Sequence, residues 1–121
     1  MGGVIQSVRE LVVPAAIWVR KGEVILRVLG EAEELLTKHL NEAVDVSILG
    51  RDEEEKITFK AALRRFMSNG HHYVVVFFPK RLTPMIPAIE QLKDSNGRVW
   101  LLIRLLGVRK PTRRREGGGG V

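Results

Sequence analysis

The strongest strand signal in the sequence lies at residues 71–79, and it requires the chain to build a β-sheet. This run, His-His-Tyr-Val-Val-Val-Phe-Phe-Pro, consists mostly of aromatic and β-branched residues, which favour extended backbone. A second run of the same kind covers residues 98–106. Because an isolated buried strand leaves its backbone N–H and C=O groups unpaired, both runs must pair with other strands.

Residues 15–29 predict a β-hairpin. Two runs rich in β-branched and aromatic residues flank the dipeptide Lys21-Gly22. A two-residue loop of this kind is typical of a type I′ turn. The turn requires a positive φ at Lys21, which is uncommon for a residue other than glycine.

The spacing of apolar residues elsewhere predicts helices. Pro14 ends the first helix, and Asn69-Gly70 closes the third. The expected fold is an α+β domain with a four-stranded, mainly antiparallel sheet and helices packed on one of its faces. The predicted helices cover residues 3–13, 31–44, 57–67 and 84–95.

The length of 121 residues suits one domain, which we assign to residues 1–107. Residues 108–121 are basic and glycine-rich, and we expect them to form a disordered tail. The absence of cysteine and of a secretory signal or membrane-spanning run predicts a cytoplasmic protein. Few Asn and Gln beside many Glu and Arg residues favour a thermophilic source.

The net charge of +6 is unevenly distributed. Residues 1–103 contain 14 basic and 13 acidic residues, whereas residues 104–121 contain six basic residues and one acidic residue. A basic end of this kind favours an anionic partner, with nucleic acid foremost. The alternative is a tail that only keeps the protein soluble.

Strand side chains alternate between two faces, and the predicted strands divide into two sets on this basis. The first set is wholly apolar, so we expect it to contact the helices. The second set holds both tryptophans, the only tyrosine and four arginines. The apolar set is Ile17, Val19, Val24, Leu26, Val28, Val74, Val76, Phe78, Val99, Leu101, Ile103 and Leu105.

The second face predicts a surface for unpaired nucleic-acid bases, because bases stack on aromatic rings and arginines hold phosphates. Antiparallel sheets often leave one face in solvent. We expect little sequence specificity, since stacking accepts every base. The predicted binding residues are Trp18, Tyr73 and Trp100 for stacking, Arg20, Arg27, Arg98 and Arg104 for phosphate, and Arg109, Lys110, Arg113, Arg114 and Arg115 in the tail, with Arg64, Arg65, Lys80 and Arg81 extending the basic track.

A second hypothesis makes this face a contact between subunits. Tryptophan is common at interfaces, and the arginines could pair with acidic helices. The protein would then be a structural or interaction protein that forms a homo-oligomer and binds no nucleic acid.

The sequence offers little for catalysis. His71 and His72 are adjacent, so on a strand they point to opposite faces and do not share a metal ion. The acidic residues 52–55 are consecutive, whereas metal-dependent nucleases need carboxylates that converge from separate elements. No glycine-rich phosphate loop lies between a strand and a helix. We therefore predict no enzymatic activity, cofactor or metal, and keep a metal-dependent nuclease as the third hypothesis.

The arrangement resembles the ThermoDBP-related proteins of archaea. The resemblance rests on the hairpin at residues 17–29 and on the strands Tyr73-Val-Val-Val-Phe-Phe and Arg98-Val-Trp-Leu-Leu-Ile-Arg, and it covers residues 4–107. It implies binding of single-stranded nucleic acid in a cleft that is both hydrophobic and basic. Some members form dimers through a long C-terminal leucine zipper, which Gly107 and Pro111 exclude here.

Overall fold

A computed structural model of the chain describes residues 10–109, which form one antiparallel sheet and three short helical segments. No helix in this range is long and apolar enough to cross a lipid bilayer. The strands are β1 (Glu10–Arg20), β2 (Glu23–Val28), β3 (Glu42–Leu49), β4 (Glu55–Ala62), β5 (Arg64–Ser68), β6 (His71–Phe77) and β7 (Val99–Arg109). The helical segments are α1 (Ala32–Thr37), the 3-10 helix η1 (Lys80–Met85) and α2 (Ile86–Glu90).

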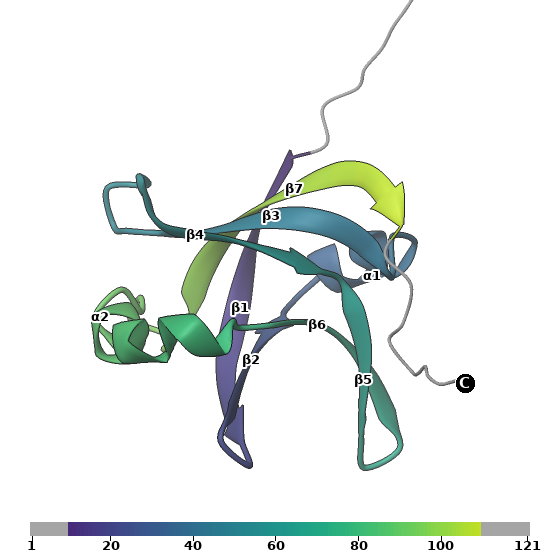
Figure 1. Cartoon of the computed structure of the whole chain (residues 1–121), viewed down its shortest axis with the longest axis horizontal. Helices are drawn as coiled ribbons and strands as arrows, with labels where there is room; N and C mark the ends of the chain where they lie inside the picture. Colours follow the sequence, from purple (N-terminus) through teal and green to yellow (C-terminus); the bar gives the residue numbers. More distant parts are fainter. Residues whose placement is uncertain (1–9, 110–121) are drawn as a thin grey trace, which may run out of the picture.

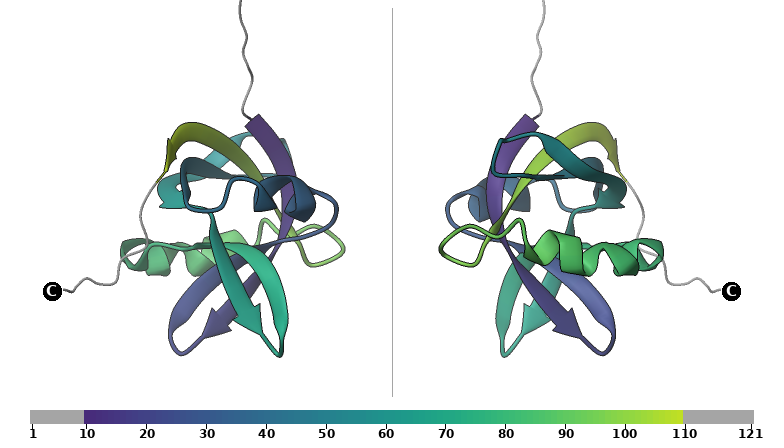
Figure 2. Two further views of the ribbon diagram at one scale, coloured as in Figure 1. Left: turned by 90° about the vertical axis from the view of Figure 1, so that its right-hand side faces the viewer. Right: turned by 90° about the vertical axis from the view of Figure 1, so that its left-hand side faces the viewer.

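The sheet curls strongly around the core. Its strand order is β4-β3-β7-β1-β2-β6-β5, and its two outermost strands, β4 and β5, are consecutive in the chain. Figures 1 and 2 show the strands wrapped around a common centre, with the β1–β2 and β5–β6 hairpins at the same end of the molecule. The resulting shape is barrel-like rather than a flat layer.

Leu63 is the point at which the curled sheet closes. Its N–H donates to the carbonyl of Glu42 at 3.1 Å, and its carbonyl accepts the N–H of Asn41 at 2.6 Å. The next residue, Arg64, pairs with Val75 of β6 instead. One bent stretch of chain therefore bonds to β3 along β4 and to β6 along β5.

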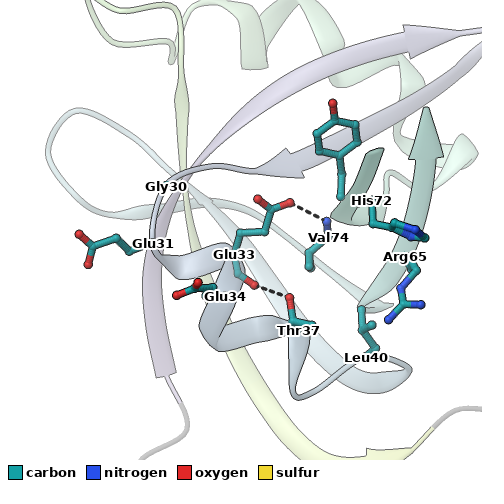
Figure 3. Close-up of a pocket in the computed structure, with 10 residues that line it drawn as sticks. Gly30, Glu31, Glu33, Glu34, Thr37, Leu40, Arg65, His72 and Val74 are labelled. Atoms are coloured by element: carbon teal, nitrogen blue, oxygen red, sulfur yellow. Dashed lines mark hydrogen bonds between the residues drawn. The ribbon is translucent and has the colours of Figure 1, made fainter. Parts of the chain in front are cut away.

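The helical segments reach the core from different sides. Leu36 of α1 and Ile89 of α2 are both fully buried, and Figure 1 places the two helices at opposite sides of the molecule. A hydrogen bond from the N–H of Val74 to the Glu33 carboxylate, 3.1 Å long, links α1 to β6 (Figure 3). Neither helix is long enough to cover a face of the sheet.

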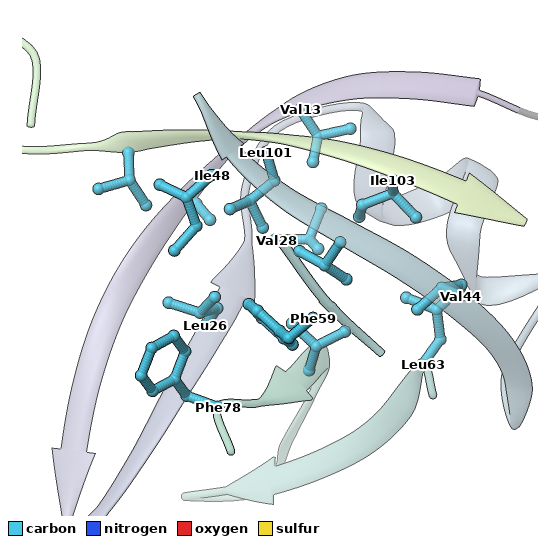
Figure 4. Packing of buried hydrophobic residues seen from close by; sticks show 14 of the residues in the cluster. Val13, Leu26, Val28, Val44, Ile48, Phe59, Leu63, Phe78, Leu101 and Ile103 are labelled. Carbon is cyan, nitrogen blue, oxygen red and sulfur yellow. The ribbon is translucent and has the colours of Figure 1, made fainter. Parts of the chain in front are cut away.

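The core consists of side chains that the strands direct toward the centre (Figure 4). The apolar set predicted from strand alternation supplies much of it, including Leu26, Val76 and Leu101. Its partners come mainly from the opposite wall of the barrel, where Val46 and Phe59 lie on β3 and β4. Val19 is the exception, since 65% of it is exposed beside the β1–β2 turn.

The predicted fold class was wrong. The expected four-stranded sheet with helices on one face is a seven-stranded antiparallel sheet. The predicted helix at residues 57–67 is β4 followed by β5, and residues 42–44 of the helix predicted at 31–44 belong to β3. Residues 10–13 of the first predicted helix lie in β1, and residues 1–9 lie outside the described residues.

The 57–67 segment imitates a helix because its alternation changes phase at the bend. Ile57 and Phe59 are buried and alternate with exposed residues, as in a strand. Ala62 and Leu63 are then buried consecutively. Apolar residues counted across both phases give a spacing close to that of a helix.

The local strand predictions were confirmed. Lys21 and Gly22 have φ of 51° and 80° and join β1 to β2, as expected of a type I′ turn. The strand predicted at 71–79 is β6, and the strand predicted at 98–106 is β7. β7 runs on to Arg109, two residues into the segment assigned to the tail.

Pro14 lies inside β1 without breaking it. Its carbonyl accepts the N–H of Leu29 at 2.9 Å, so its ring nitrogen faces the same side, where β2 has already ended. The missing N–H therefore costs no bond to β7, where Pro14 lies opposite Trp100.

Leu63→Ala tests the importance of the bend. We expect a loss of about 2–5 kcal/mol in the free energy of unfolding, since a fully buried leucine is removed. Met67→Ala is the control, because Met67 is 61% exposed, and its effect should be within about 0.5 kcal/mol. Urea denaturation measures both, and equal stabilities would contradict the role given to Leu63.

Candidate nucleic-acid interface

Trp18 of β1, Arg27 of β2 and Tyr73 of β6 meet on the outer face of the sheet. The Trp18 and Tyr73 rings are in edge contact, with centroids 5.3 Å apart and planes at 88°. The Arg27 guanidinium carbon lies 4.1 Å from the Tyr73 ring centroid and 5.4 Å from that of Trp18. Both separations fall within the range of a cation–π interaction.

Strand β5 adds a third ring to this group. Phe66 lies 6.1 Å from Trp18 between ring centroids, and the Arg20 guanidinium lies 5.4 Å from the Phe66 ring. Arg20 also donates a hydrogen bond to the hydroxyl of Ser68 at 3.4 Å. We refer to Trp18, Arg20, Arg27, Phe66 and Tyr73 as the aromatic–arginine cluster.

The cluster joins two hairpins. In the sheet, β1 and β5 are separated by β2 and β6, yet Trp18 and Phe66 are in contact. Ile25 and Val75, on the same outer face, are 1% and 0% exposed. The three rings are half-buried. The face is therefore a partly buried cluster between the hairpins rather than the flat open surface expected from the sequence.

The arginines of the cluster form no ion pair with the described residues, although Glu23 lies opposite Arg20 in the register of β1 and β2. In the part of the chain that the structure describes, no carboxylate lies within ion-pair distance of Arg20 or Arg27. The Nε of Arg27 is buried and has no hydrogen-bond partner there. Lys21, in the adjoining turn, is exposed. These charges favour an anionic ligand at this end of the molecule.

Arg104, by contrast, is fully engaged by acidic residues. Its Nε donates to Glu10 at 2.8 Å, and its Nη1 and Nη2 donate to Glu55 at 3.2 and 2.8 Å. These bonds, together with one from Ser47, lower the pKa of Glu55 to about 2, and the two carboxylates raise the pKa of Arg104. This arginine joins β1, β7 and β4 and is not available to phosphate in this arrangement.

Trp100 lies in a separate environment. Its Nε1 donates to Asp94 at 2.9 Å, and its side chain borders a cavity of about 590 Å³ with Val12 and Leu102. Hydrogen bonds from the Arg98 backbone N–H and then from Trp100 lower the pKa of Asp94. Because Trp100 lies opposite Pro14, it is about 13 Å along β1 from Trp18.

The predicted binding residues are thus divided by the structure. Trp18, Arg20, Arg27 and Tyr73 come together, whereas Arg98, Trp100 and Arg104 lie around β7. Of the residues proposed to extend the basic track, Arg64 donates to Asn41 at 2.7 Å, Arg65 lines a pocket beside Tyr73, and Lys80 and Arg81 belong to η1. Arg109 ends β7 opposite Glu42. Lys110, Arg113, Arg114 and Arg115 lie outside the described residues.

Sequence reasoning missed Phe66, because residues 57–67 were assigned to a helix. The signal that could have located it is Asn69-Gly70, which is a strong indicator of a two-residue hairpin turn. Asn69 and Gly70 have φ of 52° and 81° and join β5 to β6, which places Phe66 opposite Tyr73.

Residues 10–109 contain no group of three or more His, Asp or Glu side chains placed to hold a metal ion. Comparison of the chain with protein-family models, curated proteins and solved structures gave no match. The function is therefore inferred from the site itself.

The ion pairs of Arg104 predict an acid-dependent stability. The pKa of Glu55 is lower in the folded protein, about 2, than its ordinary value of 4.5. The Glu55 carboxylate therefore contributes fully to stability above its ordinary pKa, and this contribution is lost as the pH falls toward its pKa in the folded protein. Arg104→Met should flatten the fall in unfolding free energy over this acid range, as measured by urea denaturation at a series of pH values.

Lys60→Met is the matched control, because it removes a positive charge from the same face at a side chain that is 83% exposed, where its 3.2 Å ion pair with Asp45 is open to solvent and contributes little to stability. We expect it to keep the wild-type acid dependence. Identical acid profiles for wild type and Arg104→Met would contradict the assignment of the Glu55 pKa to Arg104.

Proposed function

We propose that the protein binds single-stranded nucleic acid, DNA or RNA, at the aromatic–arginine cluster and catalyses no reaction on it. The observation that carries this proposal is the gathering of three rings and two arginines without carboxylate partners on one outer surface. Unpaired bases stack on such rings, and the guanidinium groups attract the phosphates between them.

The geometry favours single strands over duplexes. The rings lie partly buried between two hairpins, so a base must leave its own stack to reach them. This step costs little in a single strand and several times more in a duplex, where bases are both paired and stacked. Little sequence preference is expected from stacking alone.

The basic C-terminal segment supports the same ligand. Lys110, Arg113, Arg114 and Arg115 add four positive charges within six residues. Contacts of this kind with phosphate weaken as salt rises, whereas stacking on the cluster depends less on salt. We place this binding in the cytoplasm, since the chain contains no cysteine.

Trp18→Ala tests the stacking site. We expect the Kd for a labelled single-stranded oligonucleotide to rise about 5- to 150-fold, which corresponds to the loss of about 1–3 kcal/mol for one stacked base. Trp18→Phe keeps an aromatic surface and should recover most of the affinity. Fluorescence anisotropy measures each Kd, and circular dichroism checks that the variants are folded.

Trp100→Ala is the matched control, because it removes the second indole from the same face but outside the cluster. Its Kd should stay within about twofold of the wild type, since Trp100 is hydrogen-bonded to Asp94 and lies about 13 Å along β1 from Trp18. A folded Trp18→Ala protein with wild-type affinity would reject the cluster as the binding site.

A second candidate function is self-association through the outer face of β1 and β7. Val12 is 58% exposed and Trp100 is 37% exposed, and they border the same cavity. Exposed apolar side chains that lie together favour a protein contact. Light scattering at micromolar concentrations tests this alternative: Val12→Glu should dissociate such an oligomer, and a monomeric wild-type protein would exclude it.

A further inference from the structure

A hollow of about 740 Å³ lies between α1 and the β5–β6 hairpin (Figure 3). This volume is within the range of about 300–1,000 Å³ that is typical of small-molecule pockets. Tyr73 lines the hollow and also belongs to the aromatic–arginine cluster. Because His72 and Val74, which also line the hollow, alternate with Tyr73 along β6, the hollow lies on the opposite face of this strand from the cluster, and the two sites meet at Tyr73.

The walls of the hollow differ in chemistry. The carboxylates of Glu33 and Glu34 of α1 lie on one side, whereas the Arg65 guanidinium and the His72 imidazole of the β5–β6 hairpin lie on the other (Figure 3). No ion pair joins the two walls among residues 10–109. A ligand that bridges them needs a hydrogen-bond donor at one end and a negative charge at the other. A nucleotide with an amino group on its base meets both requirements.

Glu33 is the acceptor that the fold orients. One of its carboxylate oxygens, Oε2, accepts the N–H of Val74 at 3.1 Å, and Val74 directly follows Tyr73. The other oxygen, Oε1, has no hydrogen-bond partner in the described part of the chain and is not buried. Because the carboxylate is held at one oxygen by the backbone of β6, the second oxygen is an acceptor fixed beside this strand.

We infer that this pocket receives one base of the bound strand and favours bases with an exocyclic amine, through a hydrogen bond to Glu33. The inference rests on the proposed function and adds a base preference to it. Cytosine carries an amine donor at position 4, where thymine and uracil carry a carbonyl acceptor. A carboxylate attracts the former and repels the latter. The acidic wall also directs the phosphate toward Arg65.

Homopolymers of deoxycytidine and deoxyuridine of equal length test the inference, because their bases differ in the groups at positions 3 and 4. We expect the wild-type protein to bind the deoxycytidine strand about tenfold more tightly, as suits one hydrogen bond to a charged acceptor. The measurement is fluorescence anisotropy above neutral pH, where cytosine is uncharged.

Glu33→Gln supplies a second measurement. Its amide oxygen can still accept the Val74 N–H, while its NH₂ group replaces the free oxygen and becomes a donor. The preference should then disappear or shift toward deoxyuridine. Glu54→Gln makes the same change of charge at an exposed position in the β3–β4 turn and should keep the wild-type preference.

The outcomes separate the two proposals. Equal wild-type affinity for the two strands overturns the base preference but leaves single-strand binding in place. Loss of the preference in both Glu33→Gln and Glu54→Gln assigns it to net charge and overturns the role of Glu33. Failure of every single strand to bind overturns the proposed function itself. The wild-type comparison decides the matter even if Glu33→Gln does not fold.

Discussion

The exchange of hydrogen-bonding partner at Leu63 is the constraint on which the rest of the structure depends. Because the chain bonds to β3 before this residue and to β6 after it, the sheet must curl until its ends meet. The same bend carries Phe66, three residues later, to the Trp18 ring. Core closure and assembly of the aromatic–arginine cluster are thus consequences of a single local geometry.

The outer surface of the sheet has two regions, which differ in whether their arginines are paired with carboxylates. Around β7, Arg104 is held by two carboxylates, so its charge links three strands, β1, β7 and β4. Between the hairpins, Arg20 and Arg27 contact rings instead. A contact with an aromatic ring does not neutralise the cation, and the proposed binding of an anionic ligand between the hairpins rests on this difference.

Sequence patterns predicted the features that depend on residues close together in the chain. They failed for features that depend on contacts between distant strands. The Lys21-Gly22 turn and β6 follow from local propensity, and strand alternation placed Trp18, Arg27 and Tyr73 on one face. The pairing of Arg104 with Glu10 and Glu55 joins residues 94 and 49 positions apart, so no local pattern reveals it. The bend at Leu63 shifts the alternation of buried and exposed residues between β4 and β5, so the two strands together resemble a helix in sequence.

The position of β7 has a consequence for synthesis of the protein on the ribosome. Among the strands of residues 10–109, β7 is the one that joins the β4–β3 pair to the β1-β2-β6-β5 group, and it comes last in chain order. Until residues 99–109 leave the ribosome, the two parts lack the strand between them and expose their edges. Such edges invite pairing with other chains until β7 covers them.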